Sequence, residues 1–117
     1  MLIKFKTESE SPYGILDVDP QEVFEKRQDV NIIDVRGADE FHGELGHIEG
    51  AKLITLDVLA EQLPGLAKDQ TYVFVCRSGG RSSRAAAYAK SLGFDSAYNM
   101  RGGMILWNEM GLRLADQ

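Results

Sequence analysis

An apolar segment at residues 71–76 (TYVFVC) limits the possible folds of this chain more than any other feature. Its β-branched and aromatic residues favour a strand, and the lack of polar alternation predicts that both strand faces are buried. A loop with two adjacent glycines follows, and residues 82–92 then carry apolar positions at helical spacing. A doubly buried strand that leads into a helix is typical of a parallel sheet covered by helices.

The rest of the chain repeats this alternation of strands and helices. Further strands are predicted at residues 15–18, 30–35, 51–56 and 96–100. One helix is predicted to begin near Pro20, where Asp19 and Glu22 have capping-box spacing. Two further helices are predicted at residues 57–64 and 103–110. A helical turn at most is expected near residues 39–42. The helical positions expected to face the core are Val23, Phe24, Leu56, Leu59, Leu63, Ala85, Tyr88, Ala89 and Leu92.

Length and composition predict one globular domain. The chain has 117 residues, of which 44% are hydrophobic and 26% charged, as in folded proteins of this size. We expect residues 1–14 to form a polar, loosely held N-terminal arm and residues 15–117 to form a single domain. No apolar run is long enough to cross a membrane, and the first residues lack the apolar core of a signal peptide. A cytoplasmic protein without membrane contact is therefore expected.

Charge is distributed unevenly along the chain. The formal net charge is −5, which argues against nucleic acid as a partner. Residues 70–94, however, contain no Asp or Glu and hold Arg77, Arg81, Arg84 and Lys90. The only cysteine, Cys76, lies inside this basic segment. A lone cysteine excludes an internal disulfide and fits a reducing compartment, and its basic surroundings suggest a small anion site.

The residues that follow Cys76 favour a reactive thiolate. Gly79 and Gly80 let the backbone curl so that its N–H groups turn inward, and the next helix adds the positive end of its dipole. Arg77 and Arg81 add full positive charges, so all three effects stabilise the anionic sulfur. In the alternative interpretation, Cys76 is a small buried residue at a strand end and the two glycines only form a turn.

Four segments in order resemble the rhodanese family of sulfurtransferases, from about Ile15 to Leu114. They are residues 31–36 (NIIDVR) with Glu40 and Phe41, residues 46–51 (GHIEGA), residues 76–82 (CRSGGRS), and residues 99–103 (NMRGG) with Trp107. The resemblance implies an α/β fold, with a central five-stranded parallel sheet and helices on both faces. It also implies a ping-pong reaction without a cofactor, in which Cys76 takes a sulfane sulfur from thiosulfate or a persulfide. The sulfur then passes to a thiol or to cyanide.

The resemblance also implies a set of site residues. The backbone N–H groups of residues 77–82 would surround the persulfide, and the side chains of Arg77 and Arg81 would bind the sulfonate of the sulfur donor. The Cys76-x4-Arg81 spacing is one residue shorter than the loop of related phosphatases, and no second cysteine is present for arsenate reduction. The predicted site consists of catalytic Cys76 with substrate-binding Arg77, Ser78, Gly79, Gly80, Arg81 and Ser82.

Other polar residues are predicted to have structural roles. We expect Asp34 and Arg36 to form an ion pair that involves Glu40, His47 to hold its loop through a backbone hydrogen bond, and His42 to lie on the surface. Trp107 is expected in the core. Two histidines and one cysteine at unmatched spacing make a metal site improbable.

Two further functions are compatible with the same residues. A rhodanese-like domain can serve as a binding or adaptor module, although such modules often lack the cysteine or the loop arginine that this chain has. A sulfur relay to one protein acceptor, with little turnover of free thiosulfate, is the second alternative. For its assembly we expect a monomer or a weak homodimer.

Overall fold

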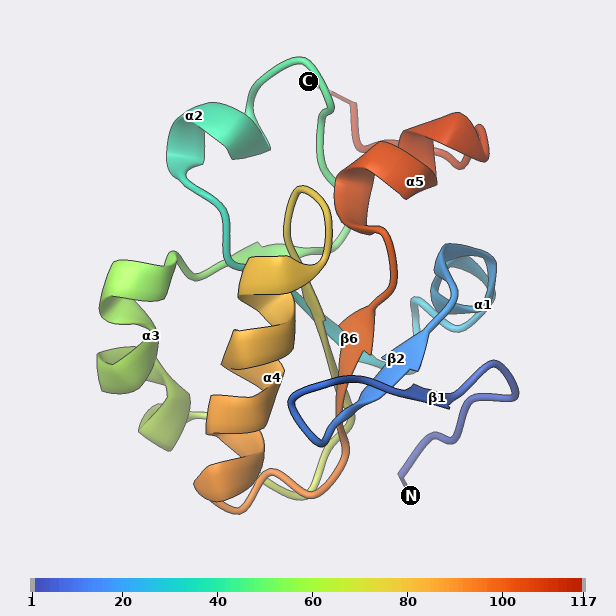
Figure 1. The fold of residues 1–117 in the computed structure, drawn as a ribbon. Helices are drawn as coiled ribbons and strands as arrows, with labels where there is room; N and C mark the ends of the chain where they lie inside the picture. The colour runs from blue at the N-terminus through green and yellow to red at the C-terminus, as the bar shows by residue number, and fades with distance from the viewer. Residues whose placement is uncertain (1, 117) are drawn as a thin grey trace.

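The computed structural model describes residues 2–116 as a three-layer α/β domain; the predicted limits at Met1 and Gln117 lie outside this range. One mixed sheet has the strand order β1-β2-β6-β5-β3-β4 (Figure 1). Its strands are β1 (Ser9–Glu10), β2 (Leu16–Val18), β3 (Asn31–Asp34), β4 (Lys52–Leu53), β5 (Tyr72–Val75) and β6 (Ala97–Met100). The helices are α1 (Pro20–Glu25), α2 (Ala38–Phe41), α3 (Leu56–Gln62), α4 (Gly80–Ser91) and α5 (Gly103–Glu109), with a 3₁₀ turn, η1 (Leu63–Gly65).

Alternating side chains of the central strands fill two separate cores. Ile33 and Phe74 point to the face that α3 and α4 cover, whereas Ile32 and Val73 point to the face with α1 and α5. Figure 1 shows these two helix pairs on opposite sides of the sheet. All four residues of β5 are buried, because helices lie on both of its faces. The doubly covered sheet predicted from the apolar strand is therefore confirmed.

The predicted five parallel strands are present, and the structure adds a sixth. Strands β2, β6, β5, β3 and β4 are parallel, whereas β1 pairs antiparallel with β2 through Ser9–Asp17 and Glu10–Leu16. The sequence did not predict β1 because its two residues, Ser9 and Glu10, are polar and exposed. An edge strand needs no apolar pattern when its side chains face water.

The N-terminal arm is held more firmly than its polar composition suggested. Phe5 is buried and packs edge-to-face on Tyr98, with ring centroids 4.9 Å apart. The backbone N–H groups of Lys6 and Thr7 donate to the carboxylate of Glu22, at 2.7 and 2.9 Å. The expectation of a loose arm is thus wrong, because one aromatic residue and one buried carboxylate anchor it.

Several helix details also differ from expectation. Glu22 binds the arm and forms no capping box, and the side chain of Asp19 accepts from Arg101 rather than capping α1. Leu56 and Tyr88 are exposed, because they line an open hollow between α3 and α4 rather than the core. Leu56 also begins a helix rather than ending the preceding strand. Among residues 2–116, no helix has the length and apolar composition needed to cross a bilayer.

Candidate active site

The loop between β5 and α4 surrounds the sulfur of Cys76. Strand β5 ends at Val75 and α4 begins at Gly80, so the chain turns within four residues at the carboxyl edge of the sheet. Gly79 adopts a left-handed conformation, with φ of +108°, which directs its N–H inward to donate to the sulfur at 3.1 Å. Gly80 needs no such conformation, and a Cβ there would meet no atom within 4 Å. The two glycines therefore have different roles.

Hydrogen bonds lower the pKa of the Cys76 thiol. The side chain is 1% exposed, and burial by itself would raise its pKa. The Ser82 hydroxyl, 3.2 Å from Sγ, and the backbone N–H groups of Ser82, Gly79 and Ser78 outweigh that effect. The net shift is downward, toward the thiolate that the loop composition predicted.

The first residues of α5 hold the cysteine loop through backbone hydrogen bonds. The N–H groups of Met104 and Ile105 donate to the carbonyls of Cys76 and Arg77, at 2.9 and 3.0 Å. Gly103 lies so close that a Cβ would come within 2.4 Å of the Arg77 carbonyl oxygen. Gly103 is therefore needed for a close backbone approach behind the cysteine loop, whereas a Cβ on Gly102 would meet the side chain of Leu106.

Arg81 is paired with an acidic residue from another element. Its Nη1 and Nη2 donate to the two carboxylate oxygens of Glu40 on α2, each at 2.9 Å. The hydrogen bond with Arg81 is the main reason that the pKa of Glu40 is lowered to about 2. The Cys76 thiolate also contributes to a raised pKa of Arg81, after the stronger effect of Glu40. Both terminal nitrogens of Arg81 are thus engaged by Glu40.

The ion pair expected between Asp34 and Arg36 is present and buried. The guanidinium binds the carboxylate through Nε and Nη2, and Nη2 also donates to the carbonyl of Gly46 at 2.7 Å. Each side chain is 1% exposed. Glu40 is not a hydrogen-bonding member of this pair, because its carboxylate is taken by Arg81. The pair fixes the end of β3 to the loop that precedes β4.

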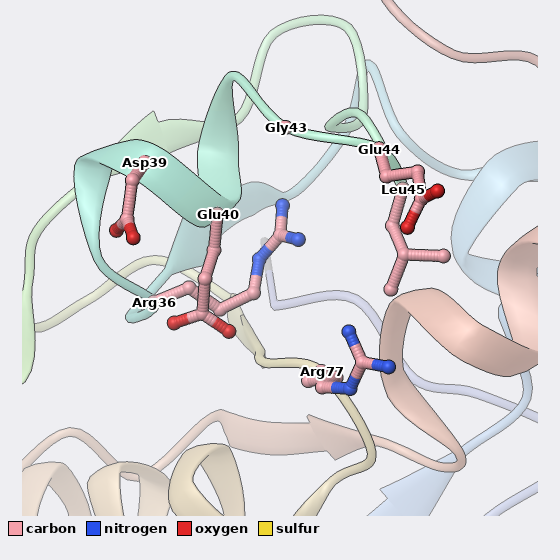
Figure 2. A pocket seen from close by; sticks show the side chains of 7 residues that line it. All are labelled: Arg36, Asp39, Glu40, Gly43, Glu44, Leu45 and Arg77. Atoms are coloured by element: carbon pink, nitrogen blue, oxygen red, sulfur yellow. The ribbon is translucent and has the colours of Figure 1, made fainter.

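A hollow of about 110 Å³ lies beside the loop, between α2 and Arg77 (Figure 2). Figure 2 shows the guanidinium groups of Arg36 and Arg77 facing it, whereas the carboxylate of Asp39 points away. A second hollow, of about 350 Å³, lies against the opposite side of the loop. It is lined by Ser78, Gly79, Gly80, Asn99, Arg101 and residues of the N-terminal arm. The loop is therefore accessible from two directions.

The predicted site residues come together, but they do not act alike. Ser78, Gly79 and Ser82 form the polar environment of the Cys76 sulfur. Arg77 is exposed and lines the smaller hollow, and Gly80 begins α4 with open space beside it. Nδ1 of His47 donates to the backbone carbonyl of Phe41 at 2.9 Å, and the imidazole stacks on the Phe41 ring, as its expected loop-holding role requires.

Three polar residues at this site have roles that sequence reasoning did not assign. Asn99 on β6 is 2.5 Å from the Ser82 hydroxyl, and Asp17 on β2 accepts from Asn99. For Glu40, the sequence suggested only a place in one of the four rhodanese-like segments and a part in the ion pair of Asp34 and Arg36. A polar residue in an otherwise apolar final strand, YNM at residues 98–100, was the available signal for Asn99. Within residues 2–116 the structure contains no cluster of three metal-ligating side chains.

The chain is similar in sequence and in fold to known sulfurtransferases. A thiosulfate sulfurtransferase, GlpE of Shewanella oneidensis, is 36% identical over 80 residues, covering 68% of this chain and 77% of that protein. The solved structure of a human single-domain sulfurtransferase has a TM-score of 0.71 and 27% identity, covering 80% of this chain and 95% of that one. A probable adenylyltransferase/sulfurtransferase of Mycobacterium tuberculosis is 38% identical over 78 residues, which cover 65% of this chain. The matched segment is only 19% of that longer protein.

The fold and the loop define an α/β domain with a cysteine at the N-terminus of a helix. Residues 19–110 match the family model described as the rhodanese-like domain. This chain belongs to the rhodanese-like domain family, and its curated relatives include sulfurtransferases. The resemblance inferred from the four sequence segments is therefore confirmed.

Proposed function

We propose that this protein is a sulfurtransferase that moves a sulfane sulfur from thiosulfate or a persulfide to a thiol, with Cys76 as the carrier. The observation that carries the proposal is the convergence of hydrogen-bond donors on Sγ. The Ser82 hydroxyl and three backbone N–H groups, of residues 78, 79 and 82, all stabilise negative charge on this atom. An inert buried cysteine has no need of such surroundings.

The first half of the reaction would load the sulfur. The Cys76 thiolate attacks the outer sulfur of thiosulfate, a new S–S bond forms, and the original S–S bond breaks with its electron pair leaving on sulfite. Arg77 is the cationic side chain best placed to hold the sulfonate, since it lines the smaller hollow and has no acidic partner among the described ion pairs. Arg81 would contribute only where the anion displaces Glu40.

The second half would discharge the sulfur to an external nucleophile. An acceptor thiolate attacks the outer persulfide sulfur, and the electron pair of the broken bond returns to Sγ as a thiolate. The chain has no second cysteine to resolve the persulfide, so the acceptor must come from outside. A small cellular thiol or a thiol-bearing protein fits this requirement, and both belong to the reducing cytoplasm that the lone cysteine suggests.

Intact mass measurement tests the proposal. The reduced protein is incubated with thiosulfate, and the expected product is heavier by one sulfur atom, which added dithiothreitol removes. Cys76→Ser is the control and should gain nothing. If thiosulfate and a glutathione persulfide both leave the wild-type mass unchanged, the carrier role of Cys76 is wrong and the adaptor function becomes the better explanation. Loading by the persulfide alone would identify a relay rather than a thiosulfate enzyme.

A further inference from the structure

A polar chain leads from the buried sulfur to the edge of the second hollow. The Ser82 hydroxyl lies 3.2 Å from Sγ of Cys76 and 2.5 Å from Oδ1 of Asn99. The Nδ2 group of Asn99 in turn donates to Oδ1 of Asp17 at 2.9 Å. Ser82 and Asn99 are both buried, at 0% and 3% exposure, so water does not replace these contacts. Their geometry therefore decides where the Ser82 proton can go.

Strand register places Asp17 and Asn99 side by side. The two residues are Cα partners in the β2–β6 ladder, and both alternate with residues whose side chains face α1 and α5. Their own side chains consequently point toward α4, where Ser82 lies in the first turn. A carboxylate only accepts hydrogen bonds, so Asp17 must face the NH₂ group of Asn99. The carbonyl oxygen of Asn99 is thereby fixed toward Ser82.

The Ser82 hydroxyl has one proton and more than one acceptor. It can donate to Sγ of Cys76, to Oδ1 of Asn99, or to the carbonyl of Gly79 at 3.3 Å. When the sulfur is a thiol, its S–H can donate to Oγ while the hydroxyl donates to Asn99. When the sulfur is a thiolate, the hydroxyl must turn to Sγ and the carbonyl of Asn99 loses its donor. Asn99 therefore favours the thiol form.

We propose that Asn99, oriented by Asp17, is a positioning residue that competes with Cys76 for the Ser82 proton and so limits how readily the sulfur ionises. The inference rests on the proposed function and extends it to the control of this site. During discharge, the bond between the two persulfide sulfurs breaks and its electron pair returns to Sγ. The Ser82 hydroxyl then leaves Asn99 and donates to the new thiolate, so no free proton is needed.

Other charges on the packed elements also act on the sulfur. Arg81 on α4 attracts the thiolate although it is paired with Glu40, and the other nearby charges are paired as well or line one of the two hollows. Those nearby groups are Asp34 and Arg36 beyond β3, Glu40 on α2, Asp17 on β2, Arg77 on the loop and Arg101 after β6. The effect of a substitution at Asn99 or Asp17 on these charges must therefore be separated from its effect through Ser82. The reference is a variant in which residue 82 has no hydroxyl.

A double-mutant cycle provides that reference. The thiolate of Cys76, the only cysteine, is titrated by its ultraviolet absorbance against a Cys76→Ser baseline. Ser82→Ala should lower the thiolate-to-thiol ratio about three- to tenfold at a given pH, the size of one hydrogen bond. Asn99→Leu should raise the ratio about threefold in the wild type and leave it unchanged in the Ser82→Ala background.

Asp17→Asn is the second variant, because Asn99→Leu alters the size of a buried group. It frees the amide to turn its NH₂ toward Ser82, which should also raise the ratio, again only where Ser82 is present. Equal effects with and without Ser82, or a lowered ratio in both variants, would overturn the proposal. The titration uses no sulfur donor, so a protein that forms no persulfide would refute the function while leaving this test intact.

Discussion

Glu40 and Arg81 form a bidentate ion pair across 41 residues of sequence, with two N–O distances of 2.9 Å. The pair joins α2 to the first turn of α4, directly beside the cysteine loop. It cancels the charge of Arg81, one of the two loop arginines that the family resemblance implies as ligands of a sulfur donor. Arg77 is therefore the principal side chain left to attract an anion in the smaller hollow, where it stands opposite the already paired Arg36.

Removing the Arg77 charge should weaken thiosulfate binding more than it slows chemistry. Arg77→Gln is expected to raise KM for thiosulfate about tenfold, the size of one charge-assisted contact, and to change kcat little. Steady-state kinetics at fixed ionic strength measure both constants. Lys90→Gln, on an exposed turn at the far end of α4, is the matched loss of charge and should leave KM unchanged. Equal effects of the two variants would show that only the overall field attracts the donor.

Releasing Arg81 from Glu40 should strengthen thiosulfate binding and favour the thiolate form of Cys76. In Glu40→Gln the guanidinium keeps its charge but loses its ionic partner, so we expect the pKa of Cys76 to fall and KM for thiosulfate to fall about threefold. Alkylation rates between about pH 5 and about pH 9 follow the fraction of thiolate. This range reaches well below the ordinary thiol pKa of about 8.5, because the pKa of Cys76 is lowered. Glu44→Gln removes the same charge from the same hollow without freeing an arginine and should change less. A rise in KM would contradict the prediction.

Anchoring of the N-terminal arm should depend on pH through Glu22. Burial raises the pKa of Glu22, but the hydrogen bond from Lys26 outweighs it, together with those from Lys6 and Thr7. The result is a pKa of about 2, against an ordinary value of 4.5. Because the folded pKa is lowered, the carboxylate stabilises the fold fully above pH 4.5. That contribution is lost as the pH falls toward 2.

Urea unfolding of wild type and Glu22→Gln measures this dependence. We expect the wild type to be more stable by about 2 kcal/mol at neutral pH, and the difference to shrink as the pH falls from 4.5 to 2. Glu25→Gln, an exposed residue of the same helix, is the control and should show a small difference throughout. A difference for Glu22→Gln that stays constant with pH would rule out the carboxylate as the source.

Two glycines beside the loop should respond oppositely to alanine. Gly103 has φ of +58°, and a Cβ would lie 2.4 Å from the Arg77 carbonyl oxygen, so Gly103→Ala must displace the loop. We expect it to lower stability by at least about 2 kcal/mol and to reduce sulfur loading. Gly80→Ala meets open space in a helix and should be neutral or stabilising by about 0.5 kcal/mol. Thermal unfolding and intact mass after thiosulfate treatment measure both properties.

Much of the fold was predictable from local patterns. The run TYVFVC required a strand buried on both faces, and the alanine-rich segment after Gly80 required a helix that approaches it closely. The five parallel strands follow from this alternation. The antiparallel β1 did not, because Ser9 and Glu10 are polar and exposed, and pairing there depends only on backbone groups that every residue has. Exposure of Leu56 and Tyr88 also depended on packing rather than on periodicity.

The sequence by itself determined the local environment of Cys76, the proposed nucleophile. A lone cysteine, two glycines and a helix start lie within consecutive residues, so their effect on the sulfur is set by short-range backbone geometry. Only the tertiary structure decided which distant groups meet that loop. Glu40 neutralises Arg81, and Asp17 fixes Asn99 against Ser82, because parallel strands far apart in sequence end at one edge of the sheet. Pairing across such distances depends on strand order and register, which no local pattern encodes.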